Sequence, residues 1–170
     1  GLVGLTATRN VLFADPVALW REAVARRPGN ARAHLNLGHV LDLRGNWEAL
    51  NWYQSALVLD PRSRWAHNNA ASILVDLGRI EEAILHARAA LEIDPVFPMA
   101  HANLASALNR ANKREEALQH ARQALLLRPS MAVAHFEVGN ALLNLGRPEE
   151  ALEHYEAEAK LRPTVADIHC

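Results

Sequence analysis

One spacing governs the whole sequence: a proline returns every 33 or 34 residues. Small residues and turn residues keep the same period to within one residue. The prolines are Pro28, Pro61, Pro95, Pro129 and Pro163, the small residues are Ala49, Ala83, Ala117 and Ala151, and the turn residues are Gly45, Gly78, Asn112 and Gly146. A repeat of this length that recurs in register predicts a row of similar units, not one irregular core.

Each unit is predicted to be a pair of short amphipathic helices. In residues 98–129, apolar side chains recur at helical spacing twice, first around Leu104 and again around Leu118. Between the two runs lies Asn112, and asparagine is the residue after glycine best able to adopt the left-handed conformation that ends a helix. The chain is therefore expected to turn back at each such position, and the predicted fold class is all-α.

The register of the repeat places the units along the chain. Asp15 is a good N-cap and Pro16 suits the first helical position, so a degenerate half unit is expected to begin there. The first full unit is one residue short between Gly45 and Ala49, which accounts for the single 33-residue step. The expected segments are an irregular lead-in at 1–14, a half-repeat helix at 15–28, full units at 29–62, 63–96, 97–130 and 131–164, and a truncated fifth pair or cap at 165–170.

Composition removes several classes of function. A formal net charge of −1 and a pI near 6.8 give no electrostatic case for binding nucleic acid. The single cysteine, Cys170, permits neither an intramolecular disulfide nor a cysteine-based metal site. No glycine-rich phosphate loop occurs, and nothing places a base and an acid beside Ser72 or Ser106, so neither an enzyme nor a cofactor is predicted. The apolar start Gly1–Leu5 is far shorter than the roughly 20 residues that span a bilayer, so the chain as given is expected to be soluble, with its compartment open.

Nine histidines invite a metal or proton-relay interpretation, but their spacing favours packing or hydrogen bonding. Five share one position of the unit and three share one position of the second helix; the first set is His34, His67, His101, His135 and His169, and the second is His86, His120 and His154. Equivalent residues of adjacent units lie on the order of 10 Å apart. Imidazole nitrogens must lie about 2.1 Å from a shared metal ion, so no metal site is predicted.

The repeated residues resemble the tetratricopeptide repeat family, whose 34-residue helix-turn-helix carries small residues at fixed positions. The matching first helices are Leu37-Gly38 with Leu41, Ala70-Ala71 with Leu74, Leu104-Ala105 with Leu108, and Val138-Gly139 with Leu142; the matching second helices are Ala49 with Tyr53, Ala83 with Ala87, Ala117 with Ala121, and Ala151 with Tyr155. The resemblance spans roughly residues 15–169. It implies an α-solenoid, a right-handed superhelix with a concave inner face.

Some residues depart from the family's pattern or gain meaning from it. The fourth position of the unit, usually aromatic, is histidine in every copy, and Glu158 replaces an expected alanine. Trp20 and Trp47 occupy aromatic positions of the family, which implies that both pack in the core. Trp52 and Trp65 are less committed and are open to a role at the surface.

The resemblance also implies which residues line the concave face. Carried over position by position, that face is mainly uncharged and rich in amides. The candidate peptide-binding residues are Asn36, His39, Asn68, Asn69, Ser72, Asn103, Ser106, Arg110, Glu137 and Asn140. An asparagine side chain both donates and accepts, so a ladder of them can pair with the backbone of an extended peptide. The alternative is that these asparagines belong to the family consensus and contact nothing.

Two known modes of recognition compete for this face. The asparagine ladder is similar to the one in the superhelix of O-linked N-acetylglucosamine transferases. A clamp for a terminal carboxylate would need lysine or arginine, and only Arg32 and Arg110, two units apart, are candidates. The ladder is therefore favoured over the clamp.

Three functions remain open from the sequence. The first is a non-catalytic interaction scaffold that binds a peptide segment of a protein partner in the concave groove. The second is the recognition arm of a larger glycosyltransferase, either of the soluble asparagine-ladder type or of the multispanning membrane type. Residues 8–21 resemble the junction between the last membrane span and the repeats in the multispanning type, and Gly1–Leu5 would then be the end of a span. The third is self-assembly, because an array that ended at Cys170 would leave Leu152, Tyr155 and Ala159 without a covering helix.

Overall fold

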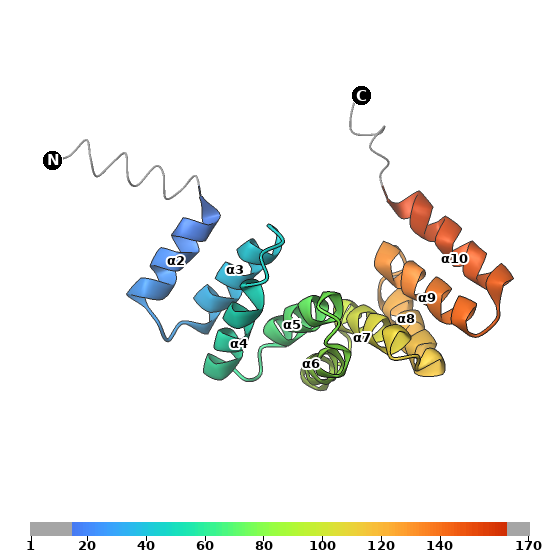
Figure 1. The fold of residues 1–170 in the computed structure, drawn as a ribbon, viewed down its shortest axis with the longest axis horizontal. Coiled ribbons are helices and arrows are strands. Elements are labelled where there is room, and N and C mark those ends of the chain that lie inside the picture. Colours follow the sequence, from blue (N-terminus) through green and yellow to red (C-terminus); the bar gives the residue numbers. More distant parts are fainter. Residues whose placement is uncertain (1–14, 163–170) are drawn as a thin grey trace, which may run out of the picture. The chain divides into compact units, whose positions relative to one another are not determined.

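The computed structural model describes residues 15–162, and this part of the chain is helical throughout, with no strand (Figure 1). Its helices are α2 (Pro16–Arg26), α3 (Ala31–Asp42), α4 (Ala49–Leu59), α5 (Arg64–Asp76), α6 (Ile80–Ile93), α7 (Pro98–Arg110), α8 (Arg114–Leu127), α9 (Ala132–Asn144) and α10 (Pro148–Leu161). The predicted all-α fold class is confirmed. The expected lead-in at 1–14 and the expected fifth helix from 165 lie outside the described residues.

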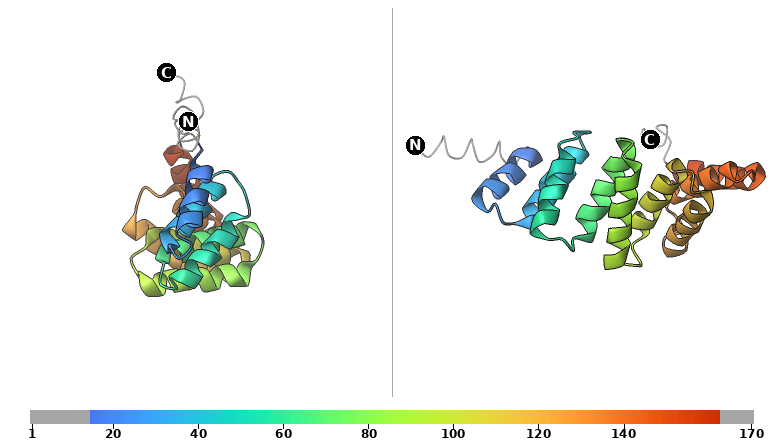
Figure 2. Two further views of the ribbon diagram at one scale, coloured as in Figure 1. Left: turned by 90° about the vertical axis from the view of Figure 1, so that its left-hand side faces the viewer. Right: turned by 60° about the horizontal axis from the view of Figure 1, so that its bottom comes forward.

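The chain divides into two compact units, with the boundary between Ala70 and Ala71 inside α5. In the first unit, α3 packs against α2 and α4. In the second unit, α7 packs against α6 and α8, and α9 packs against α8 and α10. The consecutive pairs can be followed by colour in Figure 2. Within each unit these helices thus pack mainly on their neighbours along the chain, which is the organisation of a solenoid.

The turns inside the helix pairs use the left-handed backbone conformation. The φ angle is +66° at Gly45, +74° at Gly78 and Gly146, and +60° at Asn112. Among the described residues, Asn112 is the one non-glycine residue with a positive φ. The amide that follows it, that of Lys113, donates to the Leu108 carbonyl at 2.9 Å and closes the end of α7. The predicted reversals of the chain are confirmed at all four positions.

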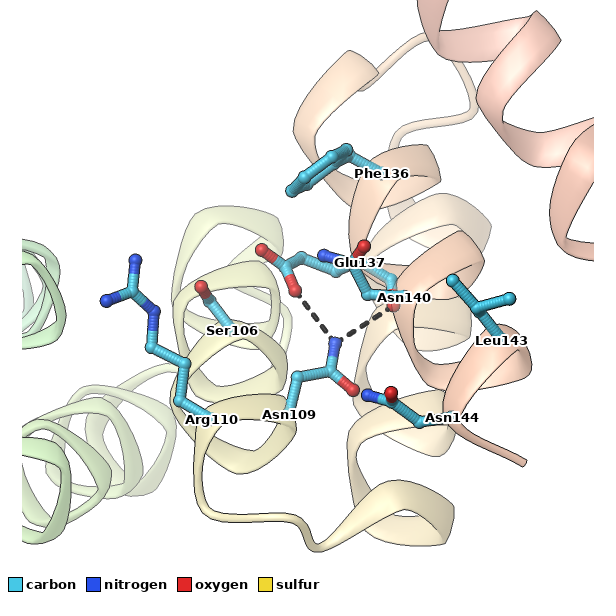
Figure 3. Close-up of a pocket in the computed structure, with 8 residues that line it drawn as sticks. All are labelled: Ser106, Asn109, Arg110, Phe136, Glu137, Asn140, Leu143 and Asn144. Atoms are coloured by element: carbon cyan, nitrogen blue, oxygen red, sulfur yellow. Dashed lines mark hydrogen bonds between the residues drawn. The ribbon is translucent and has the colours of Figure 1, made fainter. Parts of the chain in front are cut away.

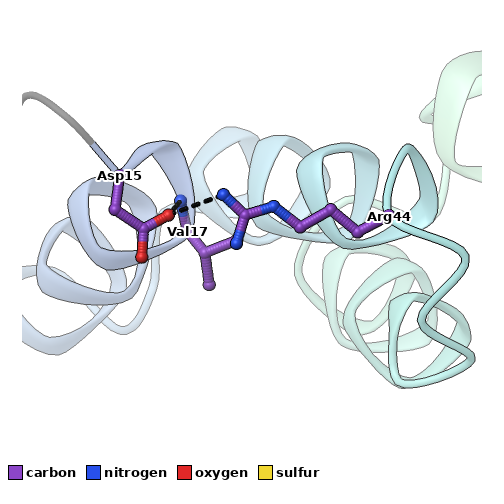
Figure 4. A network of polar contacts seen from close by, with 3 residues as sticks. All are labelled: Asp15, Val17 and Arg44. Atoms are coloured by element: carbon purple, nitrogen blue, oxygen red, sulfur yellow. Dashed lines mark hydrogen bonds and ion pairs between the residues drawn. The ribbon is translucent and has the colours of Figure 1, made fainter.

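The predicted N-cap at Asp15 is also confirmed, and Asn30 caps α3 in a similar way. The Asp15 carboxylate accepts from the Val17 amide at 3.1 Å, and the Asn30 side chain accepts from the Ala33 amide at 3.3 Å. Arg44, which follows α3, donates to the same Asp15 oxygen at 2.8 Å (Figure 4). The Val17 amide, and after it the Arg44 guanidinium, hold the pKa of Asp15 below its usual value. Asp15 therefore both begins α2 and ties it to the end of α3.

Two positions depart from the regular repeat, and one of them corrects an expectation. Trp47 is 56% exposed, so the implied core position of this residue is wrong. The cause is the missing residue after Gly45: α4 begins only at Ala49, and Trp47 lies in the turn ahead of it. Glu158, in place of an alanine, forms an ion pair with Arg162 one helical turn later. Within residues 15–162 no helix has the length and apolar character to cross a bilayer.

Candidate functional site

A pocket of about 340 Å³ opens between α7 and α9 in the second unit (Figure 3). Its lining residues are Ser106, Asn109 and Arg110 from α7, and Phe136, Glu137, Asn140, Leu143 and Asn144 from α9. Ser106, Arg110, Glu137 and Asn140 are four of the ten residues that the sequence singles out. A second pocket of similar volume, between α2 and the start of α3, contains none of the ten.

Glu137 is the buried charge of this pocket. The residue is only 5% exposed. The Asn109 amide nitrogen donates to the Glu137 carboxylate at 2.8 Å and to the Glu137 backbone carbonyl at 3.0 Å. No cation among residues 15–162 forms an ion pair with Glu137. One neutral donor offsets only part of the cost of burying a carboxylate, so this charge is under-compensated.

Arg110 carries the opposite charge at the other side of the pocket. Its Nη1 donates to the Val75 carbonyl at 2.9 Å, in the last turn of α5. The last carbonyls of a helix lack partners within the helix, and they attract cations. This contact holds the guanidinium away from Glu137, and in the view of Figure 3 the Ser106 hydroxyl lies between the two charged groups. The pocket therefore presents a cation and an anion that do not neutralise each other.

Asn140 is oriented by a tyrosine. The Tyr155 hydroxyl donates to the Asn140 side-chain oxygen at 2.9 Å. Burial raises the pKa of Tyr155, and the Glu137 carboxylate raises it further, so the phenol keeps its proton. Because one lone pair of the Asn140 oxygen is used, the amide NH₂ is the end of this side chain that faces elsewhere. The Phe136 ring, 40% exposed, lies 6.0 Å from the Tyr155 ring and forms an apolar wall.

The remaining candidate residues lie outside this pocket. Asn36, His39, Asn68 and Asn69 belong to the first unit, and Ser72 and Asn103 belong to the second. Asn68 is 1% exposed and donates to the Asn69 side-chain oxygen at 3.0 Å, so its role is to orient Asn69. The other five are half-buried or exposed.

The structure adds lining residues that a search for polar groups misses. Phe136 and Leu143 supply the apolar part of the pocket. A signal for Phe136 was present in the sequence, because the equivalent residue of the preceding unit is the much smaller Ala102. The change from alanine to phenylalanine between these two adjacent repeats marks a local change of surface.

The repeated histidines are hydrogen-bonded, as predicted. The Nε2 atoms of His34, His67, His101 and His135 each donate to the carbonyl of the proline six residues earlier, at 2.9, 3.2, 3.1 and 3.1 Å. A carbonyl only accepts, so Nε2 carries the proton and Nδ1 is free to accept. His120 donates from Nδ1 to the Nδ1 of His101 at 3.0 Å, and His154 does the same to His135 at 3.1 Å. Over the described range no group of three or more potential ligands is placed to hold a metal ion.

These features define an α-solenoid built from helix pairs with small residues at the crossings. The sequence pattern described as tetratricopeptide repeat matches residues 12–64, 66–97 and 102–166. The chain therefore belongs to the tetratricopeptide repeat family. Repeats of this family are typically non-catalytic interaction scaffolds, and the chain is a protein-interaction scaffold in this general sense.

Solved structures of MamA share the fold. MamA 41-end from Desulfovibrio magneticus RS-1 has a TM-score of 0.76 and 18% identity, with 94% of this chain and 93% of that chain covered. Another MamA crystal structure has a TM-score of 0.74 and 18% identity, covering 98% and 92%. MamA from AMB-1 has a TM-score of 0.72 and 20% identity, covering 93% and 94%. At these identities the likeness concerns the fold alone. No curated protein matches the sequence.

Proposed function

We propose that the chain binds a peptide segment of a protein partner through the polar face of the first helix in each helix pair. The pocket between α7 and α9 would contribute most to this binding. The observation that carries this proposal is the meeting of Ser106, Arg110, Glu137 and Asn140 in one open pocket. Each of these side chains has hydrogen-bonding capacity that its neighbours leave unused. An extended segment brings complementary groups, since each residue offers one N–H and one carbonyl.

The polar groups match those of a peptide backbone. The Asn140 NH₂ group donates, because Tyr155 already occupies its oxygen. The Ser106 hydroxyl both donates and accepts. Arg110 has further N–H groups besides the one that is bound to Val75. Phe136 and Leu143 offer apolar contact to a side chain of the segment. Such a pocket combines a few placed polar groups with apolar walls, as peptide and ligand sites do.

A random dodecapeptide library displayed on phage tests this proposal. Selected peptides are synthesised with a fluorophore, and their dissociation constants are measured by fluorescence anisotropy. We expect the double variant Ser106→Ala/Asn140→Ala to bind at least about 10-fold more weakly, the loss of two hydrogen bonds of about 1 kcal/mol each. The matched control is Gln119→Ala/Glu156→Ala, at exposed positions of α8 and α10. Peptides that bind both variants equally, or a library that yields no binders, would contradict the proposal.

The two other functions that the sequence suggests stay hypotheses. A recognition arm of a larger glycosyltransferase would use the same face within a longer protein, and part of the motif that suggests it, residues 8–14, lies outside the described residues. Self-association has one observation in its favour, because Leu152 on α10 is 57% exposed. Light scattering over a concentration series, in reductant, should then show dimers or larger species. A strict monomer at every concentration would exclude self-association.

A further inference from the structure

We infer that the pocket between α7 and α9 receives a basic side chain, lysine or arginine, of the bound segment, with Glu137 as its counter-ion. This inference rests on the proposed function and adds the chemistry that the segment must carry. Three observations support it: the burial of Glu137, its place in the repeat and the neighbouring Phe136.

The first observation is the carboxylate itself. Glu137 is only 5% exposed, and its one hydrogen-bonding side-chain partner is the neutral Asn109 amide. Buried carboxylates are usually paired with a cation. Here the missing cation has room to enter, because the carboxylate lines an open pocket and not a closed core. An ammonium or guanidinium group would form a charge-assisted hydrogen bond with it.

The second observation is the place of Glu137 in the repeat. The equivalent residues of the three preceding sequence repeats are Asn36, Asn69 and Asn103. An asparagine at this position would serve a neutral ladder equally well in every unit. Among these four positions, the change to glutamate adds a negative charge only on α9, which lines the pocket. A carboxylate favours a basic group over a neutral or an acidic one, whereas an amide does not discriminate between them by charge.

The third observation is the residue beside it. Phe136 replaces Ala102 of the preceding unit, and Figure 3 shows its ring on the same side of the pocket as the Glu137 carboxylate. Lysine and arginine carry a charged end on an apolar stem, and the stem packs well on apolar surface. The face of an aromatic ring also attracts a cation. The two changes together suit a basic side chain better than either does alone.

The size of the pocket agrees with one side chain. Its volume of about 340 Å³ lies at the lower end of the range of roughly 300–1,000 Å³ that is typical of ligand sites. A folded element would not fit in such a space. A single long side chain, entering from an extended segment that follows the polar face, would.

Arg110 is the one feature that opposes a cation, and its geometry limits the opposition. Its guanidinium is tied to the Val75 carbonyl at 2.9 Å, at the far side of the pocket from Glu137. From that place it favours a carbonyl or an acidic group of the segment. The basic side chain and a neighbouring acceptor would thus be held in a fixed direction. An acidic side chain alone would meet the buried carboxylate of Glu137 and be repelled.

The test uses small probes of defined charge and the protein without any substitution. The probes are the Nα-acetyl methylamides of lysine, arginine, norleucine and glutamate, and binding is followed by ¹⁵N–¹H NMR. We expect the lysine and arginine probes to shift the amide signals around Ser106, Asn109 and Asn140, with an affinity at least about 10-fold above that of norleucine, which has the alkyl stem without the charge. Equal affinities for lysine and norleucine, or a preference for glutamate, would overturn the inference.

Variants connect the preference to Glu137. Glu137→Gln keeps the size of the side chain, and Glu137→Asn introduces the residue of the other units; both should reduce the lysine preference to less than about 2-fold. Glu156→Gln, at an exposed position of α10, removes the same charge and should leave the preference unchanged. A Glu137→Gln protein that keeps its fold and still prefers lysine would overturn the inference.

The two proposals fail in different ways. If the displayed peptides bind and depend on Ser106 and Asn140, but contain no excess of lysine or arginine and are insensitive to Glu137→Gln, only the basic-side-chain inference fails. If no peptide depends on Ser106 and Asn140, the peptide-binding function fails. A peptide set that is rich in basic residues and loses affinity with Glu137→Gln supports both.

Discussion

Helix pairs α3–α4 and α9–α10 carry a glycine and a tyrosine at their crossings, whereas α7–α8 carries two alanines at the equivalent positions. These residues are Gly38 with Tyr53, Gly139 with Tyr155, and Ala105 with Ala121. A Cβ on Gly38 would lie 2.7 Å from the Tyr53 ring, and one on Gly139 would lie 2.5 Å from the Tyr155 ring. The comparison teaches that a tyrosine ring in the second helix requires a glycine opposite it, whereas two alanines can face each other without one.

The two glycine–tyrosine crossings differ in what they serve. Tyr53 is fully buried, and its hydroxyl donates to Asp42 at 3.2 Å. Burial, and after it the Asp42 carboxylate, raises the pKa of Tyr53, so its phenol stays neutral. Tyr155 is only half-buried, and its hydroxyl orients Asn140 of the pocket. The same crossing thus supports the core in the first unit and the candidate site in the second.

The largest expected effect separates these two tyrosines. Tyr53→Ala should lower the free energy of unfolding by about 3–5 kcal/mol, because it removes a fully buried ring and leaves a cavity. Tyr155→Ala should cost roughly half as much, since its ring is partly exposed already. Urea denaturation followed by circular dichroism measures both. The control is Val58→Ala, at a position of α4 that is 82% exposed. An equal loss at the two tyrosines would break the comparison.

The next effect tests directly whether the tyrosine ring requires the glycine. Gly38→Ala and Gly139→Ala should each cost about 1–3 kcal/mol, because the new methyl group overlaps the tyrosine ring. In the Y53A background the cost of Gly38→Ala should fall, because the ring is gone and alanine favours a helix over glycine by about 1 kcal/mol, while the Ala49 carbonyl oxygen, 3.2 Å from the new Cβ, remains. A double-mutant cycle measures this coupling.

The control for that cycle is Gly29→Ala, where a Cβ would meet nothing within 4 Å. It should show no coupling to Tyr53. Additive costs for Gly38→Ala and Tyr53→Ala would mean that the ring and the glycine do not depend on each other.

Features set by neighbours along the chain were predictable from the sequence. The left-handed Asn112 and the cap at Asp15 depend on a few adjacent residues, and both follow from residue chemistry alone. The position of Trp47 was predicted wrongly, because the core position was inferred from the family pattern and the missing residue shifts the start of α4. The contact between His101 and His120 was not predicted either, because it depends on how two helices face each other.

The site shows the same division. The polar character of its residues was visible in the sequence, and four of them lie in the pocket. The burial of Glu137 was not visible, because it results from the packing of α9 against α7 and from the Asn109 side chain. Which polar groups are left without partners is a property of the packed structure. It is this property that separates Glu137 from the exposed acidic residues.

A smaller effect concerns how stability depends on pH. It distinguishes α8, which carries a histidine that titrates, from α4, which does not carry one at the same position. The position held by His120 in α8 is Trp52 in α4, where it packs on His34 at 5.5 Å. Burial and the facing His101 lower the pKa of His120, and Arg88 lowers it too, against the opposite effect of Glu116. The unfolded chain then binds more protons than the folded one below the ordinary histidine pKa of about 6.5. The contribution of His120 to the free energy of unfolding is therefore fully present above that pH. It is lost as the pH falls through the folded-state pKa of His120.

Thermal melting between about pH 7.5 and pH 5 measures this loss. His120→Gln should reduce it, because glutamine still donates a hydrogen bond to His101 but does not titrate. His39→Gln, at an exposed position of α3, should leave the pH dependence as it is. An unchanged pH profile for His120→Gln would mean that the histidine pair contributes nothing to the acid sensitivity.

The smallest effect concerns the ion pair between Arg88 of α6 and Glu116 of α8. The two side chains are 48% and 36% exposed, so water and salt screen their attraction. Neutralising either partner, with Arg88→Gln or Glu116→Gln, should cost only about 0.2–1 kcal/mol, and the coupling in a double-mutant cycle should vanish in 1 M salt. The same changes should shift the pKa of His120 in opposite directions, upward without Arg88 and downward without Glu116, which NMR titration of the ring measures. A coupling free energy that persists in 1 M salt would show that this ion pair stabilises the fold as a buried contact does, like the tyrosine crossings, and not as a screened surface pair.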